Sequence, residues 1–437
     1  MPRLFVRRSL TAVGIYSSVA LGYLATVLAS RELHSTRAFG DYATVIFTTG
    51  FLQSFFDLTV EEALVKYGFR YVTREDWGRL RALFRSALWV KLAGSLLGAG
   101  GLLVFAALAP SRLTVPILLA AGIPLGQSLE GLAGSALYLR GRYDVRAAFL
   151  TWSMALRLAG VGVGAHFGLS EAVAGVLAGQ LLAAASVGLA GRLALRRFPR
   201  GTQRPLGEER REIVSFVLQS SAATGVLSLR GGLGPLLLGA VTGTTQVGLF
   251  KVAQAPQSGF QALSAPARMV LLTEQTRDWE GGRQSVVLRG VRRYSLVAFL
   301  LSIVAVPPLY VFVPDLIRLV NGARYVGASG AARIFVLVAA VQLIVGWTKS
   351  FPVSIGRPGL RIWTHGVETL VVLPLIVVLG NFWGATGAAG AMLAGMCVFA
   401  AMWAVIFLRI RPEDVGRPAP LGEALADEEI EAGALAR

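Results

Sequence analysis

Residues 294–314 read YSLVAFLLSIVAVPPLYVFVP, a stretch without a single charged side chain. An α-helix needs about 20 predominantly apolar residues to cross the hydrocarbon core of a bilayer. The stretch also lacks the regular alternation of apolar and polar residues that marks a strand of a membrane barrel. It therefore predicts a helix that spans a membrane.

Similar apolar runs recur along the whole chain. Hydrophobic residues make up 54% of its 437 residues and charged residues only 15%, whereas a soluble domain has about 25% charged residues. A soluble two-domain protein is therefore excluded, and an all-α integral membrane protein is expected. The runs predict about twelve transmembrane helices, near residues 10–30, 42–64, 87–109, 115–138, 147–168, 172–191, 213–234, 236–272, 294–314, 330–351, 362–380 and 386–408.

The net charge of +17 is distributed in bursts between the apolar runs. A nucleic-acid-binding protein would carry its Lys and Arg along one polar face, so that class is not favoured. Counting between the predicted spans places 29 Lys and Arg on the side of the N-terminus and 5 on the other side. Because cytoplasmic loops carry the excess of Lys and Arg, we expect a multi-pass protein of the inner (cytoplasmic) membrane with both termini in the cytoplasm.

A weak internal repeat divides the chain into halves. The segment AFGDYATVIF (residues 38–47) overlays QVGLFKVAQA (residues 246–255), which matches Gly40 to Gly248. The offset crosses an even number of spans, so the repeat predicts two six-helix bundles in the same orientation, and a parallel repeat of this kind places a substrate site between the halves. The expected division is 1–191 for the N-terminal bundle, 192–212 for a basic cytoplasmic connector, 213–410 for the C-terminal bundle and 411–437 for an acidic cytoplasmic tail.

Four segments together carry a family resemblance. They are RRSLTAVGIYSSVALGYLATVLASREL (residues 7–33), FGDYATVIFTTGFLQSFFDLTVEEALVKYGFRY (39–71), VGLFKVAQAPQ (247–257) and VNGARYVGASGAARIF (320–335). In this order the chain resembles the polysaccharide transporter group of the multidrug/oligosaccharidyl-lipid/polysaccharide exporter superfamily, which contains the O-antigen and capsule-repeat flippases.

The resemblance implies two lobes around a central cleft that opens alternately to each side of the membrane. It implies a flippase that moves an undecaprenyl-diphosphate-linked oligosaccharide to the outer leaflet, for the biosynthesis of a surface polysaccharide such as the O-antigen of lipopolysaccharide. The implied partners are this lipid-linked oligosaccharide, membrane lipids, and a glycan polymerase or glycosyltransferase.

Cationic side chains inside predicted spans are the candidates for binding a diphosphate, because an intramembrane charge is costly unless it has a function or a partner. The predicted substrate-binding residues are Arg230, Lys251 and Arg268. Arg230 is the deepest by hydropathy, and the glycines that follow it would let a sugar or another backbone approach. The alternative for Arg230 is a purely structural ion pair.

Acidic side chains cluster at the end of the second predicted span. Asp57 and Glu61 are four residues apart, which would place them on one helical face, and Glu62 follows. Either these three acids bind a driving cation or proton, or they neutralise Lys66, Arg70 and the arginines of the expected cleft. Two further acids, Glu130 and Glu368, stand alone in apolar spans and would need partners.

Several kinds of chemistry lack a sequence signal. The chain has no G-x-x-x-x-G-K-[ST] phosphate loop, three scattered histidines without metal-ligand spacing and one cysteine, Cys397. We therefore expect no catalytic residue, metal or cofactor. Two alternatives remain open: a cation-coupled small-molecule exporter of the same superfamily, and a polytopic glycan polymerase or ligase. The latter is less favoured because the predicted external segments reach only about 10–15 residues.

Overall fold

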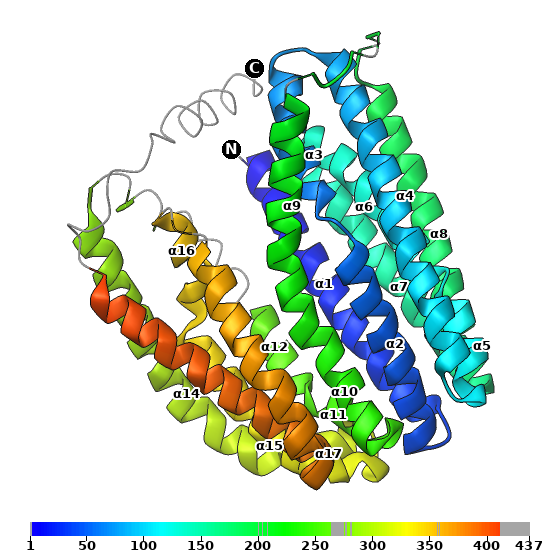
Figure 1. The fold of residues 1–437 in the computed structure, drawn as a ribbon, viewed down its shortest axis with the longest axis vertical. Coiled ribbons are helices and arrows are strands. Elements are labelled where there is room, and N and C mark those ends of the chain that lie inside the picture. Colours follow the sequence, from blue (N-terminus) through cyan, green and yellow to red (C-terminus); the bar gives the residue numbers. More distant parts are fainter. Residues whose placement is uncertain are drawn as a thin grey trace.

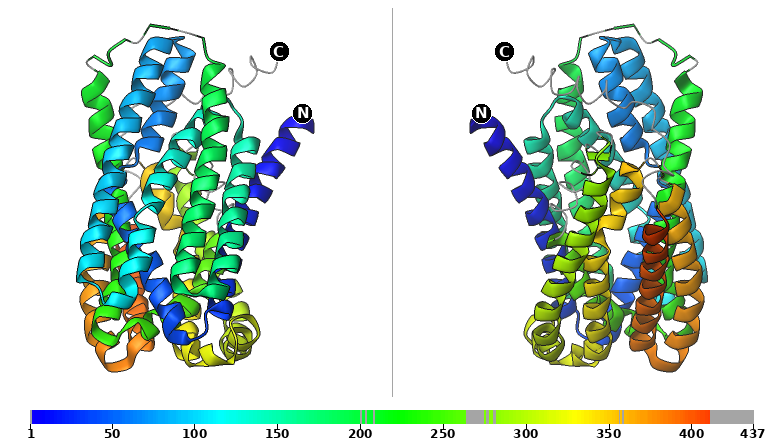
Figure 2. Two further views of the ribbon diagram at one scale, coloured as in Figure 1. Left: turned by 90° about the vertical axis from the view of Figure 1, so that its right-hand side faces the viewer. Right: turned by 90° about the vertical axis from the view of Figure 1, so that its left-hand side faces the viewer.

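The computed structural model describes residues 2–410, apart from residues 200, 203, 208, 264–274, 276, 277, 280, 281, 356 and 358. The predicted acidic tail, 411–437, lies outside the described residues. The described residues form helices and connecting turns without any strand. Most of the long helices run between the same two ends of the molecule (Figures 1 and 2). The prediction of an all-α architecture is confirmed.

The first half of the chain forms eight helices. They are α1 (Pro2–Glu32), α2 (Thr36–Phe56), α3 (Val60–Thr73), α4 (Trp77–Leu108), α5 (Ser111–Ala120), α6 (Ile123–Leu139), α7 (Tyr143–Phe167) and α8 (Leu169–Arg196). Helices α2 and α3 are bent by 42° at a short break and together correspond to the second predicted span.

The second half is more broken. Its elements are α9 (Glu209–Ser228), the π-helix η1 (Leu229–Leu233), α10 (Gly234–Thr242), α11 (Thr244–Ala253), α12 (Ala255–Leu263), α14 (Gln284–Val320), the 3₁₀ turn η2 (Ala323–Ala328), α15 (Ser329–Ile344), the 3₁₀ turn η3 (Gly346–Lys349), α16 (Phe351–Ser354) and α17 (Gly359–Arg409). Within the predicted span 236–272, the helix breaks at Gly243, between α10 and α11.

Helix α17 contains two spans joined at Gly384. This glycine has φ 56° and ψ −136°, outside the helical region. A side chain on Gly387 would collide with the Leu379 carbonyl, and one on Gly395 would collide with Val372. The later glycine thus contacts the earlier residue of the first part, so the two parts of α17 pack antiparallel. They correspond to the predicted spans 362–380 and 386–408.

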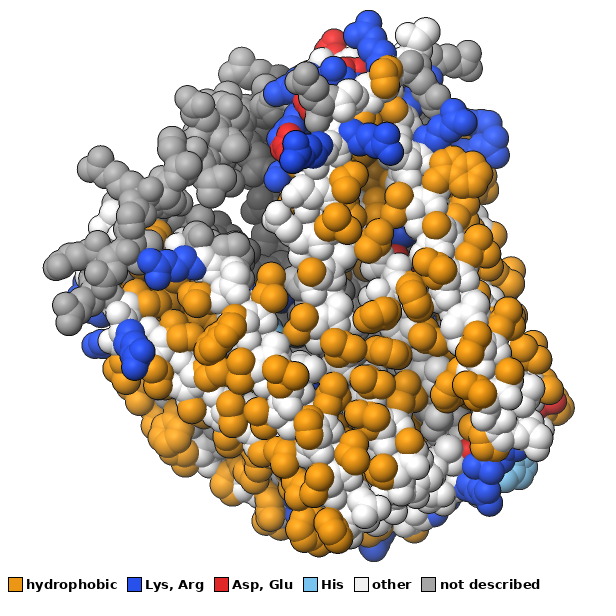
Figure 3. Space-filling view, in the orientation of Figure 1, with side chains coloured by type: hydrophobic (Ala, Val, Ile, Leu, Met, Phe, Trp, Pro, Cys, Tyr) orange, Lys and Arg blue, Asp and Glu red, His pale blue; other side chains and the backbone are white. Residues whose placement is uncertain are grey.

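The described helices are compatible with twelve crossings. Eight helical segments are long and apolar enough to cross a bilayer, two of which combine α5 with α6 and η2 with α15, and the bent pair α2–α3 makes nine. The second part of α17 and the broken segments α9–η1–α10 and α11–α12 account for the remaining predicted spans. Hydrophobic side chains cover the middle of the surface, while Lys and Arg gather toward its ends (Figure 3). So large an apolar surface is typical of a protein that faces lipid.

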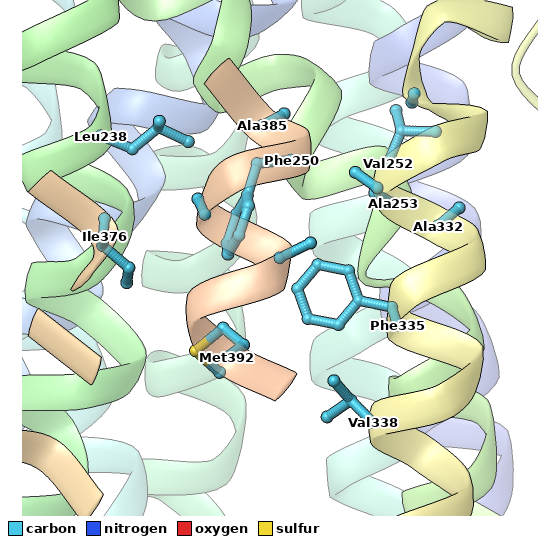
Figure 4. Close-up of a cluster of buried hydrophobic side chains, with 14 of the residues drawn as sticks. Leu238, Phe250, Val252, Ala253, Ala332, Phe335, Val338, Ile376, Ala385 and Met392 are labelled. Atoms are coloured by element: carbon cyan, nitrogen blue, oxygen red, sulfur yellow. The ribbon is translucent and has the colours of Figure 1, made fainter. Parts of the chain in front are cut away.

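Helix α2 lies between the two halves. Gly40 contacts Thr244 and Gly248 on α11, where a side chain on either glycine would be too close to the facing backbone. Further along α2, Phe51 packs against Gly232 of η1. The far side of α11 is held by an apolar cluster with α15 and α17 (Figure 4), in which the Phe250 and Phe335 rings lie 5.2 Å apart.

Contacts between the halves differ at the two ends. We call the end with the start of α1, the turns 74–76 and 140–142, and the described residues between α8 and α9 the basic end. There, α3 pairs with α9 through Arg70 and Glu212, whose atoms Nη2 and Oε1 lie 3.2 Å apart. At the opposite end, Arg31 of α1 donates to the Leu319 and Val320 carbonyls of α14. In return, Arg324 donates to the Ser30 and Arg31 carbonyls at 2.6 and 2.7 Å.

The orientation of these ends in the membrane gives the first prediction. We expect the basic end to face the cytoplasm, because it carries the excess of Lys and Arg. In a Cys397→Ala background, a maleimide that cannot cross the membrane should label His34→Cys in intact cells. It should label Thr202→Cys, in the connector, only after the membrane is permeabilised. Labelling of Thr202→Cys in intact cells would reverse the proposed orientation.

Candidate functional site

Arg230, the deepest predicted cation, forms an ion pair with Glu368 on α17. The Glu368 side chain is 2% exposed and that of Arg230 is 17% exposed. The second carboxylate oxygen of Glu368, Oε2, lies 3.0 Å from Nδ1 of His365, one turn earlier on α17. The expectation that Glu368 needs a partner is therefore met by a cation and a histidine from two different elements.

The π-helix η1 places Arg230 at the boundary between the halves. A π-turn inserts an extra residue into a helix and is frequent at functional sites. Of the three glycines predicted to allow a close approach, Gly232 faces Phe51 of α2 and Gly234 faces Ile376 of α17. A side chain on Gly231 would meet no described atom within 4 Å. Two glycines thus serve helix packing, and open space remains beside Arg230 at the third.

Lys251, the second predicted cation, is half-buried on α11. Its Nζ lies 4.8 Å from the ring centre of Phe47 on α2, a cation–π contact. Among the described residues, no carboxylate lies within ion-pair distance of Lys251. Arg268, the third predicted cation, lies outside the described residues.

The acidic cluster differs from its predicted geometry. Asp57 ends α2, and the chain leaves the helix before α3 begins at Val60, so Asp57 and Glu61 do not share one continuous helical face. Both carboxylates nevertheless contact the same Nζ of Lys91 on α4, at 2.5 and 2.6 Å. The Lys91 side chain is 1% exposed. An ammonium group buried to this extent requires counter-charges, and the α2–α3 break turns both acids toward it.

The predicted partners Lys66 and Arg70 are engaged elsewhere. Lys66 lies over the ring of Phe216, with 4.3 Å from Nζ to the ring centre. Arg70 pairs with Glu212, and the hydrogen bonds from Arg70 lower the pKa of Glu212, which precedes the predicted span 213–234. Glu62 accepts a hydrogen bond from the Ser220 hydroxyl of α9. Asp57, Glu61 and Glu62 therefore do not pair with Lys66 or Arg70 as predicted; their partners are Lys91 and Ser220.

A second buried network surrounds Glu130 on α6. Its Oε2 accepts hydrogen bonds at 3.1 Å from Ser153, Arg157 and Gln180. Arg146 approaches Oε1 at 3.6 Å. The sequence interpretation placed Arg146 in a loop and missed Gln180. The signal for Arg146 was its spacing of seven and eleven residues from Ser153 and Arg157, which places all three on one face of α7.

The Lys91 contacts give the second prediction. Lys91→Met would leave two carboxylates in a half-buried site without their cation. Breaking such a pair costs about 3–5 kcal/mol when the remaining charge is buried. We therefore expect a clearly lower melting temperature in detergent, partly restored by adding Asp57→Asn. The matched control is Lys66→Met, which removes cation–π contacts with Tyr67 and Phe216 but none of the described ion pairs. Equal melting of the two lysine variants would argue against the role of Lys91.

The sequence matches the model of a family described as polysaccharide biosynthesis protein over residues 8–272. This match extends over more than half of the chain. The chain therefore belongs to the polysaccharide biosynthesis protein family, which confirms the resemblance found in the sequence. A comparison with curated protein sequences gave no match.

The fold is that of the transporters of the MOP superfamily. It is similar to a lipid II flippase MurJ in an inward closed conformation, with a TM-score of 0.72, 14% identity, and coverage of 91% of this chain and 89% of that chain. It is also similar to an inward-facing MATE multidrug transporter, with a TM-score of 0.65, 12% identity, and coverage of 90% and 96%. A third similar structure is a MOP superfamily transporter from Pyrococcus furiosus, with a TM-score of 0.62, 11% identity, and coverage of 92% of this chain and 94% of that chain.

Proposed function

We propose that the chain is a flippase that translocates an undecaprenyl-diphosphate-linked oligosaccharide across the cytoplasmic membrane by alternating access. The product would serve the biosynthesis of a cell-surface polysaccharide such as O-antigen. The observation that carries this proposal is Arg230, a cation inside a predicted span that lies beside open space at Gly231. Family membership and the fold shared with a lipid II flippase support it.

The charge around Arg230 suits an anionic headgroup. A diphosphate crosses a bilayer only if fixed cations replace part of its hydration, and a guanidinium matches phosphate oxygens with two parallel hydrogen bonds. Arg230 and Lys251 carry two positive charges, and Glu368 carries one negative charge. Both segments face α2, since Lys251 contacts Phe47 and η1 contacts Phe51, one helical turn apart. The excess positive charge is available to a ligand between the halves.

The contacts at the opposite end suit a state loaded from the basic end. The reciprocal bonds of Arg31 and Arg324 hold α1 against α14 and η2 there. Opening of the opposite end requires that these bonds break, as alternating access demands. On the proposed orientation, the lipid-linked substrate enters from the cytoplasmic leaflet. A glycan polymerase outside or a glycosyltransferase inside would be the functional partners.

A cation-coupled small-molecule exporter is the second candidate, favoured by the fold shared with MATE transporters. Such an exporter would act without a lipid-linked glycan. Reconstitution distinguishes the candidates. A flippase changes the leaflet distribution of an undecaprenyl-diphosphate-linked glycan in liposomes, whereas an exporter moves a soluble compound across the liposome membrane.

The third prediction tests Arg230. Arg230→Ala should abolish surface display of the glycan, and Arg230→Lys should restore part of it, because Lys keeps the charge but not the paired donors. The matched control, Arg333→Ala, removes a half-buried arginine of α15 that donates to the Tyr310 carbonyl and should preserve display. Membrane abundance is measured for each variant by immunoblot.

Glu368 would be left buried without a cation in Arg230→Ala, which could impair folding. The double variant Arg230→Ala/Glu368→Gln removes both charges and should fold while remaining inactive. Full glycan display by either variant with normal abundance would remove Arg230 from the mechanism.

The fourth prediction concerns energy coupling, for which we propose Asp57 and Glu61. Two carboxylates share one ammonium, so the group has one negative charge in excess and can accept a proton or cation. Both side chains keep access to solvent, at 28% and 33% exposure. Glu61→Gln should retain substrate binding but lose the response of flipping to collapse of the proton gradient or membrane potential.

Glu62→Gln is the matched control, because Glu62 contacts Ser220 instead of Lys91. It should flip substrate and respond to the gradients like the wild-type protein. A wild-type protein whose reconstituted activity ignores both gradients would refute coupling and leave these acids with a structural role.

A further inference from the structure

Glu368 is shared between two groups that compete for it. Its Oε1 contacts Arg230 and its Oε2 lies 3.0 Å from Nδ1 of His365. We infer that His365 is a positioning residue: by taking up a proton, it allows Glu368 to release Arg230 to an anionic headgroup. This inference rests on the proposed function, since the headgroup is that of the lipid-linked substrate.

The two protonation states of His365 have different consequences for Arg230. A neutral imidazole can donate its Nδ1–H to Glu368, but Arg230 is then the only cation that compensates the buried carboxylate. A proton added at Nε2 from water makes the ring an imidazolium, which compensates Glu368 without Arg230. The guanidinium is then free to turn toward a phosphate. By linkage, anion binding and proton uptake favour each other.

The geometry fixes His365 more firmly than Arg230. His365 and Glu368 are three residues apart on α17, so they stay neighbours whenever this helix is intact. The His365 ring stacks on Phe399 of the second part of α17, with ring centres 4.8 Å apart and an interplanar angle of 18°. Arg230 reaches Glu368 from η1 with a long side chain. Arg230 is therefore the partner able to leave.

Several other charged side chains near this part of α17 contact groups other than His365, Glu368 and Arg230. Lys251 of α11 faces Phe47, and Arg333 of α15 faces Tyr310. Glu209 and Glu212 of α9 face α3. The remaining charged residues on the described elements that pack here are Arg210 and Arg211 of α9, Lys349 of η3, and Arg361 and Arg409 near the ends of α17. Among the described carboxylates, Glu368 alone is in ion-pair distance of His365 and Arg230.

Arg361 is the charged residue whose position requires a control. It lies four residues before His365 on α17, so the two can share a helical face. Its charge does not change with pH in the physiological range, because arginine stays protonated. It can shift the pH at which His365 takes up a proton but cannot supply a titration of its own. Arg361→Gln should therefore move the pH dependence without abolishing it.

The test measures binding of undecaprenyl diphosphate to the full chain in phosphatidylcholine nanodiscs at pH 8 and pH 6. The wild-type protein should bind about tenfold more tightly at pH 6, in the usual range of a coupling between two sites. His365→Asn keeps an amide donor for Glu368 but cannot titrate, so its affinity should change much less between the two pH values than that of the wild-type protein. The ligand itself gains protons in this range, and the comparison between variants removes that effect.

His166→Asn is the matched control. His166 also faces a carboxylate, with Nδ1 3.6 Å from Glu32, but this pair is exposed at the opposite end. Binding of undecaprenyl diphosphate by His166→Asn should keep the wild-type pH dependence. Glu368→Gln is the second variant: without the carboxylate, Arg230 is free at every pH, so this variant should bind about tenfold more tightly than the wild-type protein when both are measured at pH 8.

The outcomes separate this inference from the proposed function. If His365→Asn binds with the wild-type pH dependence, or if Glu368→Gln binds more weakly at pH 8, the role of His365 is overturned while the flippase proposal stands. If the wild-type protein does not bind undecaprenyl diphosphate at either pH, both are overturned. Calorimetry in two buffers of different ionisation enthalpy should also show a larger proton uptake on binding by the wild-type protein than by His365→Asn.

Discussion

The cost of placing a charge among apolar helices governs this structure. Every buried charge must find a partner, because lipid and close-packed side chains provide no water to solvate it. Lys91 has Asp57 and Glu61, Glu130 has Arg157 and a ring of donors, and Glu368 has Arg230. The first two groups join helices that are neighbours in the sequence, and the third joins η1 to α17, which are distant in the sequence. The positions of α4, α7, η1 and α17 depend on them as much as on apolar packing.

The bent pair α2–α3 relates these groups to the contact between the halves. Its break turns Asp57 and Glu61 toward α4, while the outer face of α2 receives α11 and η1. On α3, Tyr67 and Arg70 contact α9 through Glu212. A single segment thus carries Asp57 and Glu61 and also contacts Lys251 and η1 of the second half. A shift of α2 against α11 would alter both environments together.

The sequence was sufficient for features that depend on local composition. Apolar runs located the helices, and the isolated Glu130 and Glu368 correctly indicated that partners must exist. It was insufficient where the chain departs from a regular helix. The spacing of Asp57 and Glu61 suggested one helical face, yet the break at residues 57–59 removes that face and Lys91 brings the acids together again. Gln180 and His365 were missed because their roles come from contacts that no local pattern shows.

The reciprocal bonds at the opposite end have a chemical character that the basic end does not share. Arg31 and Arg324 each donate to backbone carbonyls at the end of a helix, where the helix dipole also favours a cation. Neither an arginine nor a carbonyl titrates at ordinary pH. At the basic end, Arg70 holds Glu212, whose lowered pKa means that this pair is stable above the ordinary pKa of glutamate and weakens as the pH falls through the lowered value. Acidification therefore weakens the contact at the basic end and leaves the bonds of Arg31 and Arg324 at the opposite end unchanged.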